Sequence, residues 1–462
     1  MNKPILVNKL GTSSSEIYLA DNYYIKTHKS VDINHLTSII DGIKVLKKSI
    51  PNHIECPIFT NLENSPDENG FYKLTYHQKI LEPWIKAEWI TGEQLHLLGK
   101  TIIKQQKLLI SKGLCLVDAR PDNYWLAKSY GVLVDLGSIK PLTKQNILSF
   151  QTDFQKQFTN PLILEIDLDI PISNYFKGKM NSCNINLWGL NRNFININSL
   201  KDLIKVSLIN YLSNIISSSS PDFIEFLNSE SEYSNFENSN IKGHLNSINK
   251  LQKKFKSLKP NKINQSNWNN YQEFHSKDYK LNKIKNIRNF VNSKKSFTKI
   301  VDLGSNLTTS DINEIDIRID NDLYTCRRMR QLNEDNKIIL QLDIAEYLCN
   351  YNNEKNNPLN CGGLAKAAIM TGIMHHLIID YGLRIDLFYR NLSYLFDYIL
   401  LEFPSKDDPM VKLLMRKKNE IIEWNLEEED FFTCKKFFNI KESISLSDTR
   451  RVLELQNKKI NE

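Results

Sequence analysis

The sequence predicts a folded protein of the α/β class, and two observations support this prediction. Over roughly the last 200 residues, short apolar strands alternate with helical stretches, which is the pattern of a parallel sheet covered by helices. The composition agrees, because 41% hydrophobic and 24% charged residues place the chain in the globular range. With 462 residues, and about 150 residues per domain, the chain has room for two to four domains.

The first part, residues 1–145, is expected to form an α+β domain. Alternation interrupted by small polar turns predicts strands at its start, and the helical spacing of apolar residues behind Asp32 predicts the first helix. A second helix is expected to end at Gly113, because glycine favours the left-handed conformation that closes many helices. The expected elements are three short strands within 6–28, a helix over 31–49, strand-like segments at 53–60 and 71–77, a helix over 93–112, and two short strands in LCLVD and GVLVDLG.

The next part, residues 146–260, is expected to be a helical connector with a polar loop. Its pattern is helical but irregular, and the serine run 217–220 before Pro221 opens a polar stretch that is typical of an exposed boundary. Residues 241–300 hold 15 Lys or Arg against two acidic residues, so this segment carries the whole positive excess of a chain whose net charge is +7. That net charge is small for the length and indicates no strong overall attraction to nucleic acid or acidic lipid.

The last part, residues 261–462, is expected to hold the parallel sheet. Helical spacing in LNKIKNIRNFV predicts a helix, and KIVDLG follows it as a buried strand that ends in a glycine turn. IDIRID, NKIILQLD and FDYILLEF are further apolar strands separated by helical stretches. Together they give the strand and helix alternation of an open α/β fold.

Several classes of protein are excluded by what the sequence lacks. The seven cysteines form no CxxC pair and are odd in number, so neither a zinc site nor a disulfide framework is indicated. The apolar stretch at the N-terminus is too short for a secretory signal, and no apolar run of about 18 uncharged residues is present. We therefore expect a cytoplasmic protein without a membrane span or a metal site.

Acidic residues follow three of the expected strands. Asp302 and Gly304 stand at the end of the first, Asp320 at the end of the second and Asp343 at the end of the third. The carboxyl ends of parallel strands form the ligand-binding edge of open α/β sheets, and a carboxylate there can accept hydrogen bonds from both hydroxyls of a ribose. The sequence therefore predicts a site for a nucleoside-type cofactor.

At this point the sequence resembles a known family. Residues 261–462 look like a class I methyltransferase that uses S-adenosylmethionine, of the type found in two-part bacterial proteins related to nodulation and polysaccharide-associated methyltransferases. The matching segments are WNNY, VDLGSN, IDND, QLD, IMHHL and LLEFPSKDDPMV. The resemblance implies a Rossmann-like domain, with Asp302, Gly304 and Asn306 beside the methionine part of the cofactor, Asp320 at the ribose, Asp343 at the adenine, and His375, His376 and Glu402 on the substrate side.

Two features qualify the implied roles. Adjacent histidines on a helix point to different faces, so at most one of His375 and His376 is expected to reach a substrate, and Glu402 is either a general base or a cap for the next helix. The chain also continues Asn306-Leu307-Thr308 where the family carries a further glycine, and the 14 positions from Asn306 to Asp320 leave a first helix of barely two turns.

A second constellation lies in residues 115–138. Asp118 is followed by Asn123 five positions later and by Asp135 twelve positions after that, a spacing that resembles a kinase catalytic loop and its metal-binding strand end. Upstream, Lys26 occupies the position of a phosphate-binding lysine, and EWITGEQL resembles the hinge of aminoglycoside phosphotransferases. The resemblance implies a kinase-like domain in which Asp118 orients an acceptor hydroxyl while Asn123 and Asp135 hold magnesium. A buried network that merely fixes a loop explains the same residues.

The sequence thus favours one function and leaves alternatives open. The favoured function is methyl transfer from S-adenosylmethionine to a small-molecule or saccharide acceptor. The first alternative is an ATP- and magnesium-dependent phosphotransferase at the kinase-like site, and the second is a non-catalytic scaffold with a degenerate cofactor site. Specific binding of nucleic acid is not expected, although the basic segment interleaves lysines with aromatic residues that could stack on bases, namely Phe255, Trp268, Tyr271, Phe274, Tyr279 and Phe290.

Overall fold

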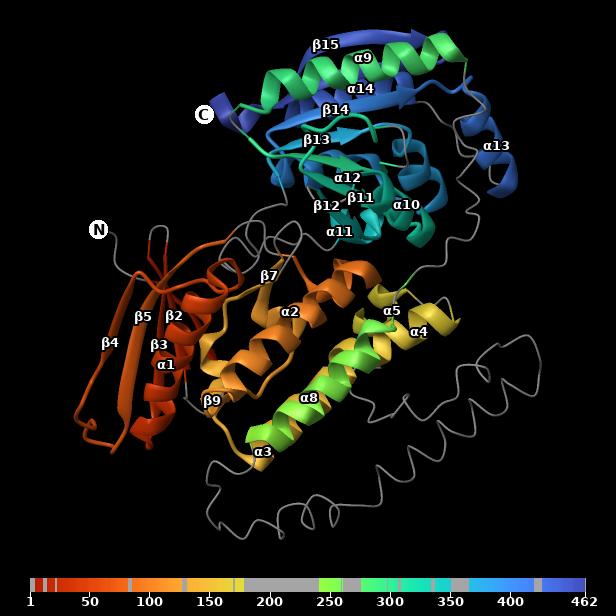
Figure 1. Cartoon of the computed structure of the whole chain (residues 1–462). Coiled ribbons are helices and arrows are strands. Elements are labelled where there is room, and N and C mark those ends of the chain that lie inside the picture. Colours follow the sequence, from red (N-terminus) through yellow and green to blue (C-terminus); the bar gives the residue numbers. More distant parts are fainter. Residues whose placement is uncertain are drawn as a thin grey trace. The chain divides into compact units, whose positions relative to one another are not determined.

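The computed structural model (Figure 1) shows a mixed α/β protein, as the sequence predicts. It describes residues 5–10, 15–20, 23–81, 85–126, 131–168, 171–177, 241–258, 260, 276–296, 298–305, 309–333, 337–349, 365–418 and 426–461. The chain divides into two compact units, one formed by Met1–Leu81 with Ile85–Lys262 and the other by Glu82–Trp84 with Ile263–Glu462.

The described part of the first unit begins with an antiparallel five-stranded sheet in the order β1-β2-β3-β5-β4. Its strands are β1 (Ile5–Leu10), β2 (Ser15–Ala20), β3 (Tyr23–Ser30), β4 (Phe59–Leu62) and β5 (Tyr72–Lys79). The helix α1 (Ile33–Ser49) packs against β3 and β5, and the Asp32 side chain caps it by accepting a hydrogen bond from the Asn34 N–H at 2.9 Å. The three strands and the helix predicted for residues 6–49 are confirmed.

The segment 53–60 differs from its prediction. The strand β4 begins only at Phe59, because Pro51–His53 form a short 3₁₀ helix and Ile54 pairs in a single bridge with Leu133. A proline fixes its own φ and lacks an N–H, so Pro51 favours the start of a helical turn over a strand.

The second helix of this unit is α2 (Gly92–Ile110), which begins at a capping box between Thr91 and Gln94. The chain leaves it through Gly113 at a φ of +72°, a left-handed conformation that glycine adopts readily. Two antiparallel pairs of short strands follow, β6 (Leu114–Leu116) with β9 (Ile139–Pro141) and β7 (Tyr124–Leu126) with β8 (Gly131–Leu133).

The helices expected to form a connector belong to the first unit. They are α3 (Lys144–Phe154), α4 (Asn160–Leu168), α5 (Ile172–Lys177) and α8 (Ile241–Lys256). The helix α8 packs along α2 (Figure 1), where the His96 ring nitrogen lies 3.2 Å from the Phe255 carbonyl oxygen. Phe154 of α3 meets the Phe255 ring edge-on at 4.9 Å between centroids. The serine run 217–220 and Pro221 lie outside the described residues.

In the described part of the second unit, seven strands form one sheet in the order β12-β11-β10-β13-β14-β16-β15. The first five are parallel, and β16 and β15 are antiparallel additions at one edge. Their bounds are β10 (Ile300–Leu303), β11 (Ile317–Asp320), β12 (Ile338–Gln341), β13 (Ala367–Met370), β14 (Tyr398–Pro404), β15 (Phe438–Ser447) and β16 (Arg450–Asn457). This arrangement is an open, mostly parallel sheet.

Both faces of this sheet are buried. On one face the helix α9 (Lys277–Lys294) packs Ile287 and Phe290 against strand side chains such as Ile300 and Leu400. Alternate residues on the other face, including Val301 and Met370, are also fully buried. A parallel sheet covered on both sides needs strands that are apolar throughout, which explains the continuous apolar segments in the sequence. The remaining helices are α10 (Leu323–Asn333), α11 (Ile344–Cys349), α12 (Ile385–Leu395), α13 (Pro409–Lys418) and α14 (Leu426–Phe437).

The connection between β10 and β11 corrects one expectation. A first helix of barely two turns was expected there, but residues 309–316 form only turns. Ile312 and Ile315 from these turns pack into the same core as α9, so they bury apolar surface in place of a helix. The strands β13, β15 and β16 are elements that the sequence did not predict. Across the described residues, no helix is long and apolar enough to cross a membrane.

Candidate functional site

The order of the strands creates a crevice at the carboxyl edge of the second sheet. From β10 the chain passes to β11 on one side, and it later returns to β13 on the other side of β10. Connections that leave neighbouring strands in opposite directions open a crevice between them, which is where open α/β sheets bind ligands. A pocket of about 560 Å³ lies there, lined by Lys283, Gly304, Asp320, Asn321, Asp322, Asp343, Ile344, Ala345, Thr371, Gly372, Ile373, His376, Leu377, Asp380 and Tyr381.

Gly304 forms the floor of this pocket directly after β10. Its φ is +72°, and a Cβ atom at this position would lie 2.8 Å from the Cδ1 atom of Ile373. The Gly304 N–H donates to the Ile319 carbonyl at 2.9 Å, which fixes the turn against β11. The left-handed backbone conformation favours glycine here, and the Ile373 side chain occupies the space that a Cβ would take.

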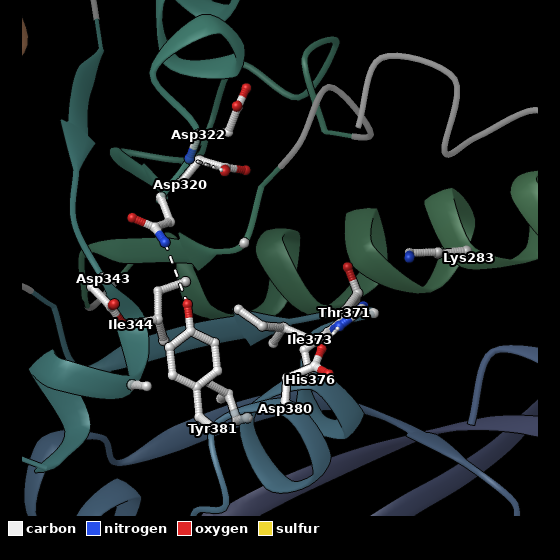
Figure 2. Close-up of a pocket in the computed structure, with 15 residues that line it drawn as sticks. Lys283, Asp320, Asp322, Asp343, Ile344, Thr371, Ile373, His376, Asp380 and Tyr381 are labelled. Carbon is white, nitrogen blue, oxygen red and sulfur yellow. Dashed lines mark hydrogen bonds and ion pairs between the residues drawn. The ribbon is translucent and has the colours of Figure 1, made fainter. Parts of the chain in front are cut away.

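Two predicted carboxylates line the same pocket (Figure 2). Asp320 ends β11 and accepts the Asp322 N–H at 2.9 Å, while Asp343 follows β12 and accepts the Glu346 N–H at 3.2 Å as the cap of α11. These bonds to backbone N–H groups hold both side chains at the strand ends. The structure therefore brings Asp320 and Asp343 to one cavity, as parallel neighbouring strands require.

Asp302 does not lie where the resemblance implies. It is fully buried, does not line the pocket, and accepts a hydrogen bond from the Thr309 hydroxyl, which in turn accepts one from Arg318. Burial raises the pKa of Asp302, and the charge of the nearby Arg318 opposes this shift in part. Asp302 thus anchors the turn after β10 from within the core. Asn306, expected beside the cofactor, lies outside the described residues.

The two adjacent histidines have different surroundings. His376 lines the pocket, and its Nδ1 atom lies 2.7 Å from the Asp380 carboxylate, four residues further along the π-helical turn His376–Asp380. His375 is fully buried, and within the described part of the chain neither of its ring nitrogens has a hydrogen-bond partner. Burial, with the neighbouring His376 and Arg450 charges, holds the pKa of His375 well below its usual range. Of the pair, only His376 is placed to meet a ligand.

Glu402, expected as a general base or a helix cap, has neither geometry. Its carboxylate is fully buried and contacts Arg450 at 2.8 Å, Lys283 at 2.9 Å and the Tyr279 hydroxyl at 2.5 Å. Burial alone would raise the pKa of Glu402, but the two cations and the hydrogen bonds hold it well below its usual range. A carboxylate so stabilised in its ionised form is a poor base. The helix α13 is capped instead by Asp408, which accepts the Met410 N–H at 3.0 Å.

The lining residues that the sequence analysis did not identify as site residues include Lys283, Asp380 and Tyr381. Lys283 reaches the pocket from α9, and its side chain is only 6% exposed. An ammonium has three N–H donors, and among the described residues the one acceptor within hydrogen-bond reach is Glu402. The spacing of Asp380 from His376 matches the i, i+4 pairing on a helix and could have indicated their contact.

The kinase-like residues also come together, in the first unit. The Asn123 side chain donates to the Asp118 carbonyl at 2.9 Å, and the Asp135 N–H donates to the Asn123 carbonyl at 3.3 Å. The Lys26 ammonium donates to the Val134 carbonyl at 3.0 Å, beside Asp135. Burial lowers the pKa of Lys26, and the Asp135 carboxylate opposes that shift. All four residues therefore belong to one neighbourhood around the two short strand pairs.

Those aromatic residues of the basic segment that the structure describes do not form a stacking surface. Phe255, Tyr279 and Phe290 are all buried in the helix packing of their own units. Bases can stack only on exposed rings, so these three cannot take part in nucleic-acid binding. Trp268, Tyr271 and Phe274 lie outside the described residues.

In the described ranges, no three His, Cys, Asp or Glu side chains come together in a way that could hold a metal ion. Comparison of the sequence with protein-family models and with curated proteins finds no match.

Proposed function

We propose that the second unit is a methyltransferase that moves a methyl group from S-adenosylmethionine to a small-molecule or saccharide acceptor. One observation carries this proposal: Asp320 and Asp343, at the ends of neighbouring parallel strands, line one pocket together with the Gly304 turn. The strand order, with the pocket at the point where it reverses, is that of a sheet that binds nucleosides.

The residues of the pocket fit the chemical groups of this cofactor. The Asp320 carboxylate can accept hydrogen bonds from the two hydroxyls of a ribose. Asp343 can accept a hydrogen bond from the amino group of an adenine. Lys283 supplies N–H donors for a carboxylate at the opposite end of the pocket, as Figure 2 shows. The volume of about 560 Å³ lies within the range for a ligand of this size. The several carboxylates also favour a ligand that carries a positive charge, as a sulfonium does.

For methyl transfer, the main task of the protein is to position the donor and the acceptor. When bound, S-adenosylmethionine would supply an electrophilic methyl group: an acceptor atom held in line with the carbon–sulfur bond would bond to the methyl carbon while that bond breaks and S-adenosylhomocysteine leaves. For a hydroxyl acceptor, the proton must also leave, and His376 is the basic side chain of the pocket that can take it. Asp380 lies 2.7 Å from the His376 Nδ1 atom and so fixes the orientation of the ring in the pocket.

The first test is calorimetry with S-adenosylhomocysteine, the product of the cofactor, and the Asp320→Asn variant. We expect the unchanged protein to bind and the variant to lose affinity by about tenfold or more, because hydrogen bonds to a charged group contribute about 1.5–3 kcal/mol. The control is Asp386→Asn, an exposed carboxylate outside the pocket whose loss should leave binding unchanged. No binding by the unchanged protein, or equal binding by Asp320→Asn, would reject the methyltransferase proposal.

A second candidate function belongs to the first unit, where Lys26, Asp118, Asn123 and Asp135 converge. Phosphoryl transfer needs a lysine for the phosphates, an Asp for the acceptor hydroxyl, and an Asn with a second Asp for magnesium. The hydrogen bonds among Asp118, Asn123 and Asp135 support this arrangement, since they fix the relative positions of the three residues. ATP and magnesium would then be the ligands of this unit.

A further inference from the structure

Tyr381 is an unusual residue for the wall of a pocket. It lies at the end of the π-helical turn after β13, and its side chain is 52% exposed although it is large and aromatic. Its N–H donates to the His376 carbonyl at 3.2 Å, and Gly382 follows it with a φ of +69°. The bond to His376 and the turn at Gly382 hold the backbone at Tyr381, while about half of the residue stays exposed.

The hydroxyl of Tyr381 joins two loops that the sheet keeps apart. Asn321, which directly follows β11, donates from its side-chain amide to this hydroxyl at 3.3 Å. The strand β10 lies between β11 and β13, so the bond passes across the carboxyl end of β10, where the Gly304 turn forms the pocket floor. Figure 2 shows this bond as the dashed line that ends at Tyr381.

The ring lies at the end of the pocket that fits a base. Tyr381, Asp343 and Ile344 all line the pocket, and Figure 2 shows them on the side away from Lys283. Burial and the nearby Asp343 carboxylate raise the pKa of Tyr381. An aromatic face, an aliphatic side chain and a hydrogen-bond acceptor are the groups that recognise a flat heterocycle with an exocyclic amine.

We propose that Tyr381 is a specificity-determining residue of the pocket, a ring held across the mouth by Asn321 that stacks on the purine base of the bound nucleoside. This inference rests on the proposed function, because it assigns the adenine end of the same ligand. The ligand class that it selects is purine nucleosides substituted at the 5′ position. The geometry that carries it is the bond across β10, which places an exposed ring over a cavity instead of over solvent alone.

The test compares ring removal with hydroxyl removal. We expect Tyr381→Ala to weaken binding of S-adenosylhomocysteine by about tenfold to a hundredfold, because the stacking of a base on an aromatic ring is lost. Tyr381→Phe keeps the ring and should bind within about threefold of the unchanged protein, since it loses only the hydroxyl bond to Asn321. Phe432→Ala removes an exposed ring on α14 outside the pocket and is the matched control.

A spectroscopic measurement separates stacking from a general loss of shape. Stacking reduces the absorbance of a purine, so titration of the unchanged protein and Tyr381→Phe with S-adenosylhomocysteine should lower the ligand absorbance near its maximum. Saturated Tyr381→Ala should not show this change. If Tyr381→Ala binds as tightly as the unchanged protein, or keeps the absorbance change, the inference about Tyr381 is wrong and the methyltransferase proposal stands. If the unchanged protein does not bind S-adenosylhomocysteine, both fail together.

Discussion

Glu402 differs from its prediction in both position and role. The resemblance implied a place on the substrate side, and a position at the end of an apolar strand indicated a general base or a helix cap, but Glu402 lies within β14. The structure instead pairs it with Lys283 and Arg450 in the core. The second partner lies on β16, a strand that the sequence did not predict, so the pairing could not have been foreseen.

Replacing Glu402 should therefore test folding and not chemistry. Glu402→Gln leaves the buried Lys283 and Arg450 cations without their shared anion, and removal of one partner from a buried ion pair typically costs about 3–5 kcal/mol. We expect the free energy of unfolding in urea to fall by that amount. The control is Asp386→Asn, which breaks an exposed pair with Arg384 and should cost at most about 1 kcal/mol. Equal stability of the two variants would contradict the buried network.

A histidine in the first unit gives a prediction about pH. The His28 ring bonds the Tyr76 hydroxyl at 2.8 Å and packs against Gly137, where an added Cβ would lie 2.4 Å from the ring. Burial lowers the pKa of His28 to about 4, the Asp135 carboxylate opposes the shift, and the Lys26 charge adds to it. In the unfolded chain its pKa is about 6.5. The folded state thus binds fewer protons than the unfolded state between these two pH values.

The sign of the effect on stability follows from this difference. Stability rises with pH where the unfolded state binds more protons, so acidification from about pH 6.5 to about pH 4 should destabilise the first unit through His28. The slope approaches about 1.4 kcal/mol per pH unit and totals about 3 kcal/mol over the window. His28→Gln keeps a donor for Tyr76 but cannot titrate, so its unfolding free energy should fall less between pH 7 and pH 4.5. Parallel curves for the two proteins would show that folding does not shift the pKa of His28.

Among the residues of the pocket, the sequence identified those that follow a strand directly. It did not identify those that reach the pocket from a helix or a distant turn. Asp320 and Asp343 follow apolar strands directly, and parallel pairing of those strands brings them together. Lys283 lies on α9, far along the chain from the strand ends that it faces. Tyr381 bonds Asn321, 60 positions earlier in the chain, and no local sequence pattern predicts a contact at that separation.

Among the helices and strands, those whose sequence signals all lie within one segment were predicted. Those whose conformation depends on pairing with another strand were not. The helix α1 has its cap at Asp32, its apolar face and its end within one stretch of sequence, and the structure confirms it. The strand β13 is only four residues long. The apolar pattern of its segment, Ala367–Met370, continues into the residues that follow, so the sequence gives no boundary for a strand. The strands β15 and β16 are polar enough to resemble loops, and their pairing with each other and with β14 gives them their conformation.

The short turn between β10 and β11 shows an element replaced by individual side chains. Parallel strands need a crossover of a dozen or more residues, usually a helix. Here Ile312 and Ile315 fill the core position of that helix, and Arg318 bonds the Ile312 carbonyl at 2.9 Å from inside the sheet. The length between the two strands indicated a reduced helix, but only the buried Asp302, Thr309 and Arg318 cluster explains how a turn can take its place.

At the scale of the whole molecule, the two candidate sites use separate parts of the chain. The residues of the kinase-like neighbourhood all lie in the first unit, and the described residues that line the pocket at β10 all lie in the second. The sequence indicated this separation, because the two motif groups stand about 160 residues apart with a polar stretch between them. The helices of the expected connector joined the first unit since their apolar residues, such as Phe255, are buried against α2 and α3.

This separation predicts that each site can be removed without loss of the other. Asp135→Asn keeps the side-chain oxygen that accepts the Gly137 N–H at 3.2 Å but removes the charge that would hold magnesium. We expect it to abolish binding of ATP with magnesium in calorimetry while S-adenosylhomocysteine binds as before. Asp320→Asn should give the opposite pattern, and Asp41→Asn, at an exposed residue of α1 that pairs with Lys44, should change neither. ATP binding that survives in Asp135→Asn would mean that the lysine and carboxylate network around Asn123 only fixes a loop, and the phosphotransferase candidate would then be withdrawn without affecting the second unit.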